Sequence, residues 1–259
     1  MPHFKSWRSY LDFQQSVCQK LRYVRMPEDD DFLKTVLVTS EPRKVKIGAG
    51  TVYWRAQLGH DWEVENQGEE EFLVPCQYSS DRMKPRPDRA AEGRANPKGI
   101  PHLYLSTQME TAMSEVRPGI GSIISVGQFK FMRELVVIDC SRNHADFPIF
   151  FNEPDPAERE HAVWAHIDNA FAEPVDRSDD AAEYVPTQII TEMFKREGYD
   201  GIAYKSAFGK KGFNIVLFDI DAAELINCFL YKVTNVSFEF SETANPYFVD
   251  KHYKSKDKN

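Results

Sequence analysis

The order of apolar and polar positions predicts a helical beginning followed by a mixed domain. Residues 7–24 carry apolar side chains at helical spacing, which indicates an amphipathic helix. A proline and four acidic residues then open a second predicted helix over 27–38, because both features favour a helix N-terminus. From Thr51 the chain becomes rich in β-branched and aromatic residues, which is typical of a strand. We therefore expect a helical N-terminal extension over 1–45 and a mixed domain over 46–240.

Strands and helices alternate irregularly through the mixed domain. Strands are predicted over 51–56, 100–105, 122–131, 134–140, 201–205, 213–219 and part of 225–240. Helices are predicted from residue 107, after residue 155 and between residues 186 and 198. Because regular βαβ repetition is missing, we expect an α+β fold with a mostly antiparallel or split sheet and flanking helices. The tail, residues 241–259, is expected to be flexible.

The segment 57–99 shows no periodicity. Its first half is acidic and its second half is basic. A segment of this length without regular structure is commonly a functional lid or a disordered loop in a compact domain. We expect one of these two, and the sequence leaves the choice open.

Composition and charge narrow the class of protein. The 259 residues are 42% hydrophobic and 28% charged, which is typical of a globular domain. No apolar run is long enough to cross a bilayer and the first residues do not resemble a signal peptide, so we expect a cytoplasmic protein without membrane binding. The net charge of −8 opposes direct binding of nucleic acid. The four cysteines are too scattered for a disulfide framework or a metal knuckle, and we expect them to be buried thiols.

One local cluster departs from the acidic average. Between Arg82 and Lys98 basic residues outnumber acidic ones. Arginine can hold phosphate oxygens in bidentate fashion, so the cluster suits a compact anion such as a pyrophosphate. Most of these side chains are expected to lie in a solvated loop. Arg94 differs, because the glycine-flanked turn over 93–99 should hold it beside the strand that carries Tyr104.

Several familiar chemistries lack their motifs in this sequence. It contains no Gly-x-Ser-x-Gly elbow, no phosphate loop ending in Gly-Lys-Ser/Thr, no complete Gly-x-Gly-x-x-Gly and no His-Glu-x-x-His. His161 and His166 are five residues apart, which splays them around a helix instead of aligning them for a metal ion. We therefore expect no metal and no bound cofactor.

Three polar residues stand out by their places in predicted elements. Arg55 interrupts an apolar strand, so it either faces solvent or has an anionic partner, and both alternatives stay open. Glu115 lies at the margin of the buried face of its helix, where the ordinary interpretation is an ion pair with Arg117 or contact with water. Ser206 ends a strand before a glycine-rich turn, which is a common place for a turn-forming serine.

Taken together, four segments resemble the RES domain family. They are Tyr53-Trp54-Arg55-Ala56, the stretch 93–106 that begins Gly-Arg-Ala-Asn-Pro-Lys-Gly-Ile-Pro, the stretch 111–118 that contains Glu115, and the stretch 199–206 that ends in Ser206. The family is named for an arginine, a glutamate and a serine, which here are Arg55, Glu115 and Ser206. The resemblance covers about residues 48–220. The long 57–99 segment and the helical extension depart from a compact member of the family.

This resemblance implies a fold related to the ADP-ribosyltransferases, and an enzyme that consumes NAD as substrate without a cofactor. Some members release nicotinamide with water or phosphate, and others transfer ADP-ribose to a protein. Many are toxins with a cognate antitoxin. The resemblance therefore implies NAD as a ligand, inorganic phosphate as a co-substrate, and an antitoxin as a protein partner. A homo-oligomer is compatible with the sequence.

Site roles follow from the chemistry that the resemblance implies. Glu115 suits the stabilisation of an oxocarbenium-like ribose. Tyr104 is the candidate platform for nicotinamide, and Arg55 and Arg94 are the candidates for the pyrophosphate. Ser206 and Asn214 would hydrogen-bond the ribose or an incoming phosphate.

Three functional hypotheses result. The first is an NAD glycohydrolase or phosphorylase, the second is ADP-ribosyl transfer to a protein, and the third is a non-catalytic module that binds NAD or ADP-ribose. Arginine, tyrosine, glutamate and serine occur together, which argues against the third. The sequence leaves the acceptor open, because water, phosphate and a protein side chain would all attack the same cation.

Overall fold

The chain folds around one large sheet in a computed structural model, which describes residues 3–68, 70–144, 146, 148–173, 181–208 and 212–240. The strands are β1 (Lys44–Ile47), β2 (Val52–Leu58), β3 (Asp61–Gln67), β4 (Glu70–Cys76), β5 (Leu103–Ser106), β6 (Ile123–Phe131), β7 (Leu135–Asp139), β8 (Gly201–Lys205), β9 (Phe213–Leu217) and β10 (Ala223–Lys232). The helices are α1 (Ser9–Gln19), α2 (Pro27–Thr39), α3 (Ser80–Met83), α4 (Met109–Glu115), α5 (Pro156–Ala172) and α6 (Val185–Arg196).

The eight-stranded sheet has the order β1-β7-β8-β9-β5-β2-β6-β10. β7 and β8 run parallel, and the other neighbouring pairs in the sheet are antiparallel. The predicted α+β class with a mostly antiparallel sheet and flanking helices is therefore confirmed. β2 and β5 are paired at a single position, Trp54 opposite Ser106, so the sheet opens between these two strands beyond that pair.

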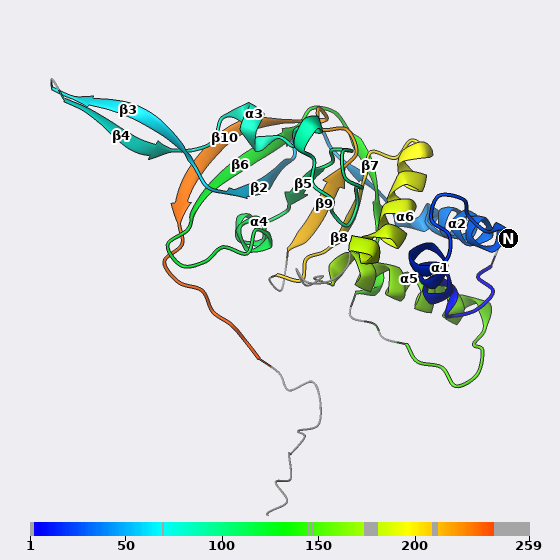
Figure 1. The fold of residues 1–259 in the computed structure, drawn as a ribbon. Coiled ribbons are helices and arrows are strands. Elements are labelled where there is room, and N and C mark those ends of the chain that lie inside the picture. The colour runs from blue at the N-terminus through cyan, green and yellow to red at the C-terminus, as the bar shows by residue number, and fades with distance from the viewer. Residues whose placement is uncertain are drawn as a thin grey trace, which may run out of the picture.

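Alternate residues of the central strands fill separate cores on the two faces of the sheet, as the period of two along a strand requires. Ile138, Ile202 and Val216 face the helices, and their neighbours in sequence pack on the opposite face with Leu103 and Phe129. Helices α1, α2, α5 and α6 gather on the first of these faces (Figure 1). The core there joins aromatic side chains of the N-terminal helices and of α5 and α6, including Phe13, Phe32, Trp164 and Phe194.

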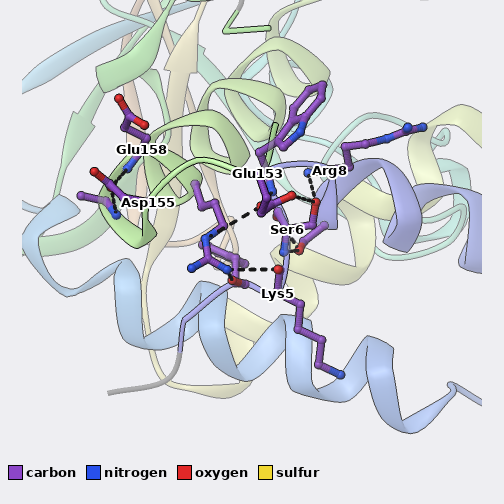
Figure 2. A network of polar contacts seen from close by, with 11 residues as sticks. Lys5, Ser6, Arg8, Glu153, Asp155 and Glu158 are labelled. Atoms are coloured by element: carbon purple, nitrogen blue, oxygen red, sulfur yellow. Dashed lines mark hydrogen bonds and ion pairs between the residues drawn. The ribbon is translucent and has the colours of Figure 1, made fainter. Parts of the chain in front are cut away.

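Polar contacts fix the N-terminal segment onto the beginning of α5. Glu153 accepts hydrogen bonds from the Ser6 hydroxyl and from the Trp7 N–H, both at 2.9 Å (Figure 2). Arg159 donates to the carbonyls of Phe4 and Lys5, at 3.2 and 3.1 Å. The extension therefore shares both its core and its polar contacts with the rest of the chain. The domain boundary at residue 45 stays a prediction.

The first helix is shorter than the pattern predicts. α1 ends at Gln19, and the side chains of Leu21 and Val24 are exposed. Pro27 disfavours a helical conformation at the residue before it, and α2 begins at that proline. The second predicted helix is confirmed as α2. Within 225–240, β10 ends at Lys232 and residues 233–240 form no helix or strand.

The expectation of no regular structure over 57–99 is wrong. This segment contains the β3–β4 hairpin and the short helix α3. The hairpin extends away from the rest of the molecule (Figure 1), and its Trp62 and Leu73 side chains are 61% and 66% exposed. Both faces of such a hairpin meet water, so it needs no apolar alternation, and this is why the periodicity failed to show it.

Two further expectations concern the four cysteines and the C-terminal tail. Cys140 is buried, but Cys18, Cys76 and Cys228 are only partly buried, so the prediction of four buried thiols is wrong. The flexible tail predicted over 241–259 lies outside the described residues. Among the residues that are described, no helix combines the length and apolar character needed to cross a membrane.

Candidate functional site

A pocket of about 840 Å³ opens where β2 and β5 diverge, beside α4. This volume lies in the range of small-molecule sites. The lining combines two carboxylates, three arginines and several aromatic rings: Trp54, Arg55, Ala56, Gln57, Leu58, Glu92, Arg94, Tyr104, Leu105, Ser106, Ala112, Glu115, Val116, Arg117, Tyr184, Tyr204 and Asn214. It therefore contains five of the six predicted site residues.

Glu115 is the last residue of α4 and is held by two hydrogen bonds on one oxygen. The Ser206 hydroxyl lies 2.6 Å from Oε1 of Glu115, and Asn214 Nδ2 donates to the same atom. Oε2 has no protein partner among the described residues. The carboxylate is thus fixed in orientation while one of its oxygens stays free to accept a hydrogen bond from a ligand. The ion pair with Arg117 that the sequence suggested does not form.

The register of the sheet places Asn214, one of the two partners of Glu115, in a row that crosses four strands. Tyr204 on β8 lies opposite Asn214 on β9, Asn214 lies opposite Ser106 on β5, and Ser106 lies opposite Trp54 on β2. These four strands are neighbours in the sheet (Figure 1). The Ser106 hydroxyl donates to Asn214 Oδ1 at 2.6 Å, which turns the amide nitrogen of Asn214 toward Glu115. A relay of three polar side chains therefore positions the carboxylate.

Arg55 spans the opening between β2 and β5. Its Nε donates to the carbonyl of Met83 at 2.9 Å and its Nη1 donates to the carbonyl of Tyr104 at 3.1 Å. It is partly buried, and no carboxylate pairs with it among the described residues, so the partner is not a protein side chain there. An anionic ligand as the partner of Arg55 stays a prediction. Burial lowers the pKa of the Arg55 guanidinium to about 10, which still leaves it charged at neutral pH. A desolvated cation without a counter-ion is a ready partner for an anionic ligand.

The turn over 93–99 holds Tyr104 by its hydroxyl. Tyr104 donates to Asn96 Oδ1 at 2.7 Å and accepts from the Ala95 N–H at 3.0 Å. Burial raises the pKa of Tyr104, so its phenol is neutral. A side chain at Gly93 would collide with the Tyr104 hydroxyl, since a Cβ built there lies 2.6 Å from that oxygen. This close approach gives the glycine before Arg94 a structural reason.

Arg94 lies in the pocket wall and also supports the fold. Its Nη1 donates to the carbonyls of Phe171 and Ala172 at 2.7 and 3.1 Å. These carbonyls belong to the last turn of α5, where a cation is favourable for the helix dipole. Arg94 therefore ties the turn over 93–99 to α5. Its predicted contact with a pyrophosphate stays a prediction.

The sequence profile of one family, described as the RES domain, matches residues 71–240. The chain belongs to the RES domain family. The matched span contains Arg94, Tyr104, Glu115, Ser206 and Asn214, and Arg55 precedes it.

A chain in the crystal structure of the M. tuberculosis MbcT–MbcA toxin–antitoxin complex is 15% identical, with a TM-score of 0.45, over 77% of this chain and 94% of that one. No curated protein matches this sequence.

In this RES domain, Ser206 lies behind the carboxylate and outside the pocket lining. It is 3% exposed, and its Oγ also accepts from the Phe208 N–H. Its contact here is with Glu115, whereas Arg55, Arg94, Tyr104, Glu115 and Asn214 reach the pocket. The predicted contact of Ser206 with ribose or phosphate stays a prediction.

Several residues of the pocket in this RES domain were not predicted from the sequence. Trp54, Tyr184 and Tyr204 add three aromatic rings to the lining. Arg117 lies at the pocket with φ 46°, a left-handed conformation that is strained for a residue before proline. Only the aromatic run beside Arg55 gave a signal in the sequence, since the other residues become neighbours through the sheet register and the loops.

The arrangement suits a ligand that is cationic at one end and anionic at the other. Glu115 can stabilise developing positive charge, and Arg55 can bind an anion. The aromatic side chains between and around them offer flat surfaces for a ring. The described residues include no group of three or more His, Cys, Asp or Glu side chains that could hold a metal ion.

Proposed function

We propose that this RES domain cleaves the bond between nicotinamide and ribose in NAD, with water or inorganic phosphate as acceptor. One observation carries this proposal: the same pocket contains an oriented carboxylate, Glu115, and a desolvated arginine without a counter-ion, Arg55. NAD presents the complementary charges, a pyridinium ring at the scissile bond and a pyrophosphate farther along the molecule.

Glu115 acts on the ribose next to nicotinamide. As the bond between C1′ and the pyridinium nitrogen lengthens, positive charge spreads over C1′ and the ring oxygen. Oε2 of Glu115 is available to hold a ribose hydroxyl and to stabilise this charge electrostatically, and the two hydrogen bonds on Oε1 keep the carboxylate in place. Because the interaction strengthens as the charge develops, it lowers the barrier rather than only the dissociation constant.

Arg55 binds the pyrophosphate. It already uses Nε and Nη1 on backbone carbonyls, so its position is fixed before the ligand arrives. The remaining guanidinium hydrogens are available to phosphate oxygens. Tyr104, tethered by its hydroxyl, and Trp54 are the candidate platforms for the nicotinamide ring.

The bond changes balance without a cofactor. Nicotinamide leaves as a neutral molecule with the electron pair of the C1′–N bond. Water then forms the new C1′–O bond and releases a proton, which gives ADP-ribose, or hydrogen phosphate forms it and gives ADP-ribose 1-phosphate. Transfer to a protein side chain would use the same cation, and the side-chain contacts described above do not favour it over the smaller acceptors.

Partners and setting follow from the family resemblance. We propose that the protein acts as a toxin and that a cognate antitoxin restrains it. Action in the cytoplasm and a homo-oligomeric state stay predictions.

Product analysis tests the proposal. Purified protein is incubated with NAD, with and without inorganic phosphate, and products are identified by mass spectrometry. Release of nicotinamide together with ADP-ribose or its 1-phosphate is expected, and the Glu115→Gln variant serves as the matched negative control. Intact NAD after prolonged incubation with folded protein would sink the proposal. Nicotinamide release that requires an added protein acceptor would redirect it to ADP-ribosyl transfer.

A further inference from the structure

A second cavity, of about 320 Å³, adjoins the proposed NAD pocket. The two cavities share Arg55, Gln57, Glu92 and Tyr104 in their linings. Arg55 therefore stands at the junction between them. The rest of the second lining comes from α3, the loop that follows it and the segment 93–102: Arg82, Lys84, Pro85, Arg86, Arg89, Ala90, Ala91, Gly93, Asn96, Pro101 and His102.

The charge of this cavity is strongly positive for an acidic protein. Its lining holds Arg55, Arg82, Lys84, Arg86 and Arg89 but a single carboxylate, Glu92. Burial and the nearby Lys195 lower the pKa of His102 to about 4, so the imidazole adds no charge at neutral pH. The lining therefore suits an anion with more than one negative charge.

Carboxylates outside the lining pair with only part of this cluster. Asp88 lies 3.3 Å from Arg86 and 3.5 Å from Arg89, and Asp221 lies 2.9 Å from Lys84. Arg82 stacks on the Tyr78 ring and, like Arg55, has no carboxylate partner among the described residues. All of the Asp88 and Asp221 pairs are solvent-exposed, so an incoming phosphate can compete for these cations at little cost.

The order of the groups matches the order of a dinucleotide. Glu115 lines only the first cavity, Arg55 lines both, and the arginine cluster lines only the second. With the scissile ribose at Glu115 and the pyrophosphate at Arg55, the adenosine half lies toward the cluster. We propose that the second cavity binds the 2′-phosphate of a 2′-phosphorylated nicotinamide dinucleotide, so that NADP is a substrate at least as good as NAD. This inference rests on the proposed function of the first pocket.

A comparison of NADP with NAD as substrates shows whether the cluster binds the 2′-phosphate or the pyrophosphate. Both dinucleotides carry the pyrophosphate, and only NADP carries the extra dianion. If the cluster binds the 2′-phosphate, removal of its charge lowers kcat/KM for NADP and leaves that for NAD nearly unchanged. If the cluster binds the pyrophosphate instead, both values fall together and their ratio stays constant.

The experiment compares kcat/KM for NADP and NAD in the wild type and in the Arg86→Ala/Arg89→Ala variant. We expect the wild-type NADP/NAD ratio to be one or higher, and the double variant to lower this ratio about ten-fold or more, since charge-assisted contacts to phosphate are among the strongest hydrogen bonds. Lys98→Ala, which removes an exposed positive charge outside both linings, is the matched control and should leave the ratio unchanged. A wild-type ratio about ten-fold below one, or an unchanged ratio in the double variant, overturns the inference.

A binding measurement keeps this test independent of catalysis. Adenosine 2′,5′-bisphosphate and adenosine 5′-monophosphate are titrated into the wild type and the double variant by calorimetry. Tighter binding of the bisphosphate to the wild type, lost in the double variant, supports a 2′-phosphate site in the second cavity even if neither dinucleotide is turned over. In that case the proposed function fails, and with it the use of NADP as a substrate, while the binding site stands. Equal affinity of the wild type for the two nucleotides overturns the inference while NAD turnover can remain.

Discussion

The Ser206 hydroxyl lies 2.6 Å from Oε1 of Glu115, although 91 positions separate the two residues in the sequence. Ser206 follows β8, and Glu115 ends α4, which packs on β2 and β5. The contact therefore exists only when the two sides of the opened sheet have assembled around the pocket. It makes the orientation of the carboxylate a property of the complete fold.

The first prediction concerns the charge of Glu115. Glu115→Gln keeps the size and the acceptor oxygen, so Ser206 and Asn214 can still donate to it. We expect kcat for NAD to fall at least about 100-fold with little change in NAD affinity, because the lost charge acts mainly on the transition state. Steady-state kinetics and calorimetric NAD binding measure both effects. Glu110→Gln on the exposed side of the same helix is the control. Wild-type turnover in Glu115→Gln would remove the catalytic role of this residue.

The second prediction treats Ser206 as a positioning residue. Ser206→Ala removes one of the two hydrogen bonds on Glu115. Ser206 is buried outside the pocket lining, so the substitution leaves the shape of the pocket unchanged. We expect kcat to fall roughly ten-fold while KM stays the same, since a net hydrogen bond to a charged group contributes about 1.5–3 kcal/mol. If KM rose instead and kcat stayed the same, Ser206 would contact the substrate directly.

Much of the fold and several site residues could be predicted from the sequence, for identifiable reasons. Helices α2, α5 and α6 carry proline or capping signals with an apolar face, and β7 is a continuous apolar run, so their patterns are local. The β3–β4 hairpin could not be predicted, because its strands bury neither face.

The site shows the same limit. The sequence singled out three polar residues by their places in predicted strands and helices, namely Arg55, Glu115 and Ser206. Their hydrogen-bond partners could not be predicted, because these partners depend on strand register. Nothing in the sequence near Arg55 shows that it bonds to carbonyls of Met83 and Tyr104, since those contacts join three separate segments. The sequence showed only the basic cluster of the second cavity. Arg55 and Tyr104 join its lining through the tertiary fold, so the cavity itself could not be predicted.

A third prediction concerns pH and lies far from the pocket. Asp168 is fully buried against His144, at 3.1 Å, and burial raises the pKa of its carboxyl from 3.8 to about 6. A raised pKa means that the protonated form stabilises the fold. This stabilisation is complete below the unfolded pKa and is lost as pH rises through about 6.

Asp168→Asn should therefore raise the melting temperature at pH 7.5 by roughly 2–5 °C and change it little near pH 4. Thermal melts at the two pH values measure the difference. Asp31→Asn, which removes an exposed ion pair with Lys34, is the control and should change the melting temperature little at either pH. An equal shift at both pH values would contradict the explanation.

The last prediction separates three arginines by what each one contacts. Arg55 has backbone carbonyls but no carboxylate, so its charge is unfavourable in the free protein and useful only with an anion bound. Arg55→Met should lower kcat/KM for NAD about ten-fold or more, because a positioned contact to phosphate contributes about 1.5–3 kcal/mol. It should lower the melting temperature less than Arg94→Met does, because removal of the buried charge offsets the two lost hydrogen bonds to carbonyls. Arg94→Met should also impair NAD use, but it leaves two carbonyls at the end of α5 without this donor and should lower the melting temperature by several degrees.

Arg86→Met, at a side chain that is 48% exposed and paired with Asp88, should change NAD use several-fold at most and mainly at low salt. Kinetics at two ionic strengths, with a thermal melt of each variant, test all three. If Arg86→Met proved as damaging to NAD use as Arg55→Met, the pyrophosphate would have to lie in the second cavity and not at the junction.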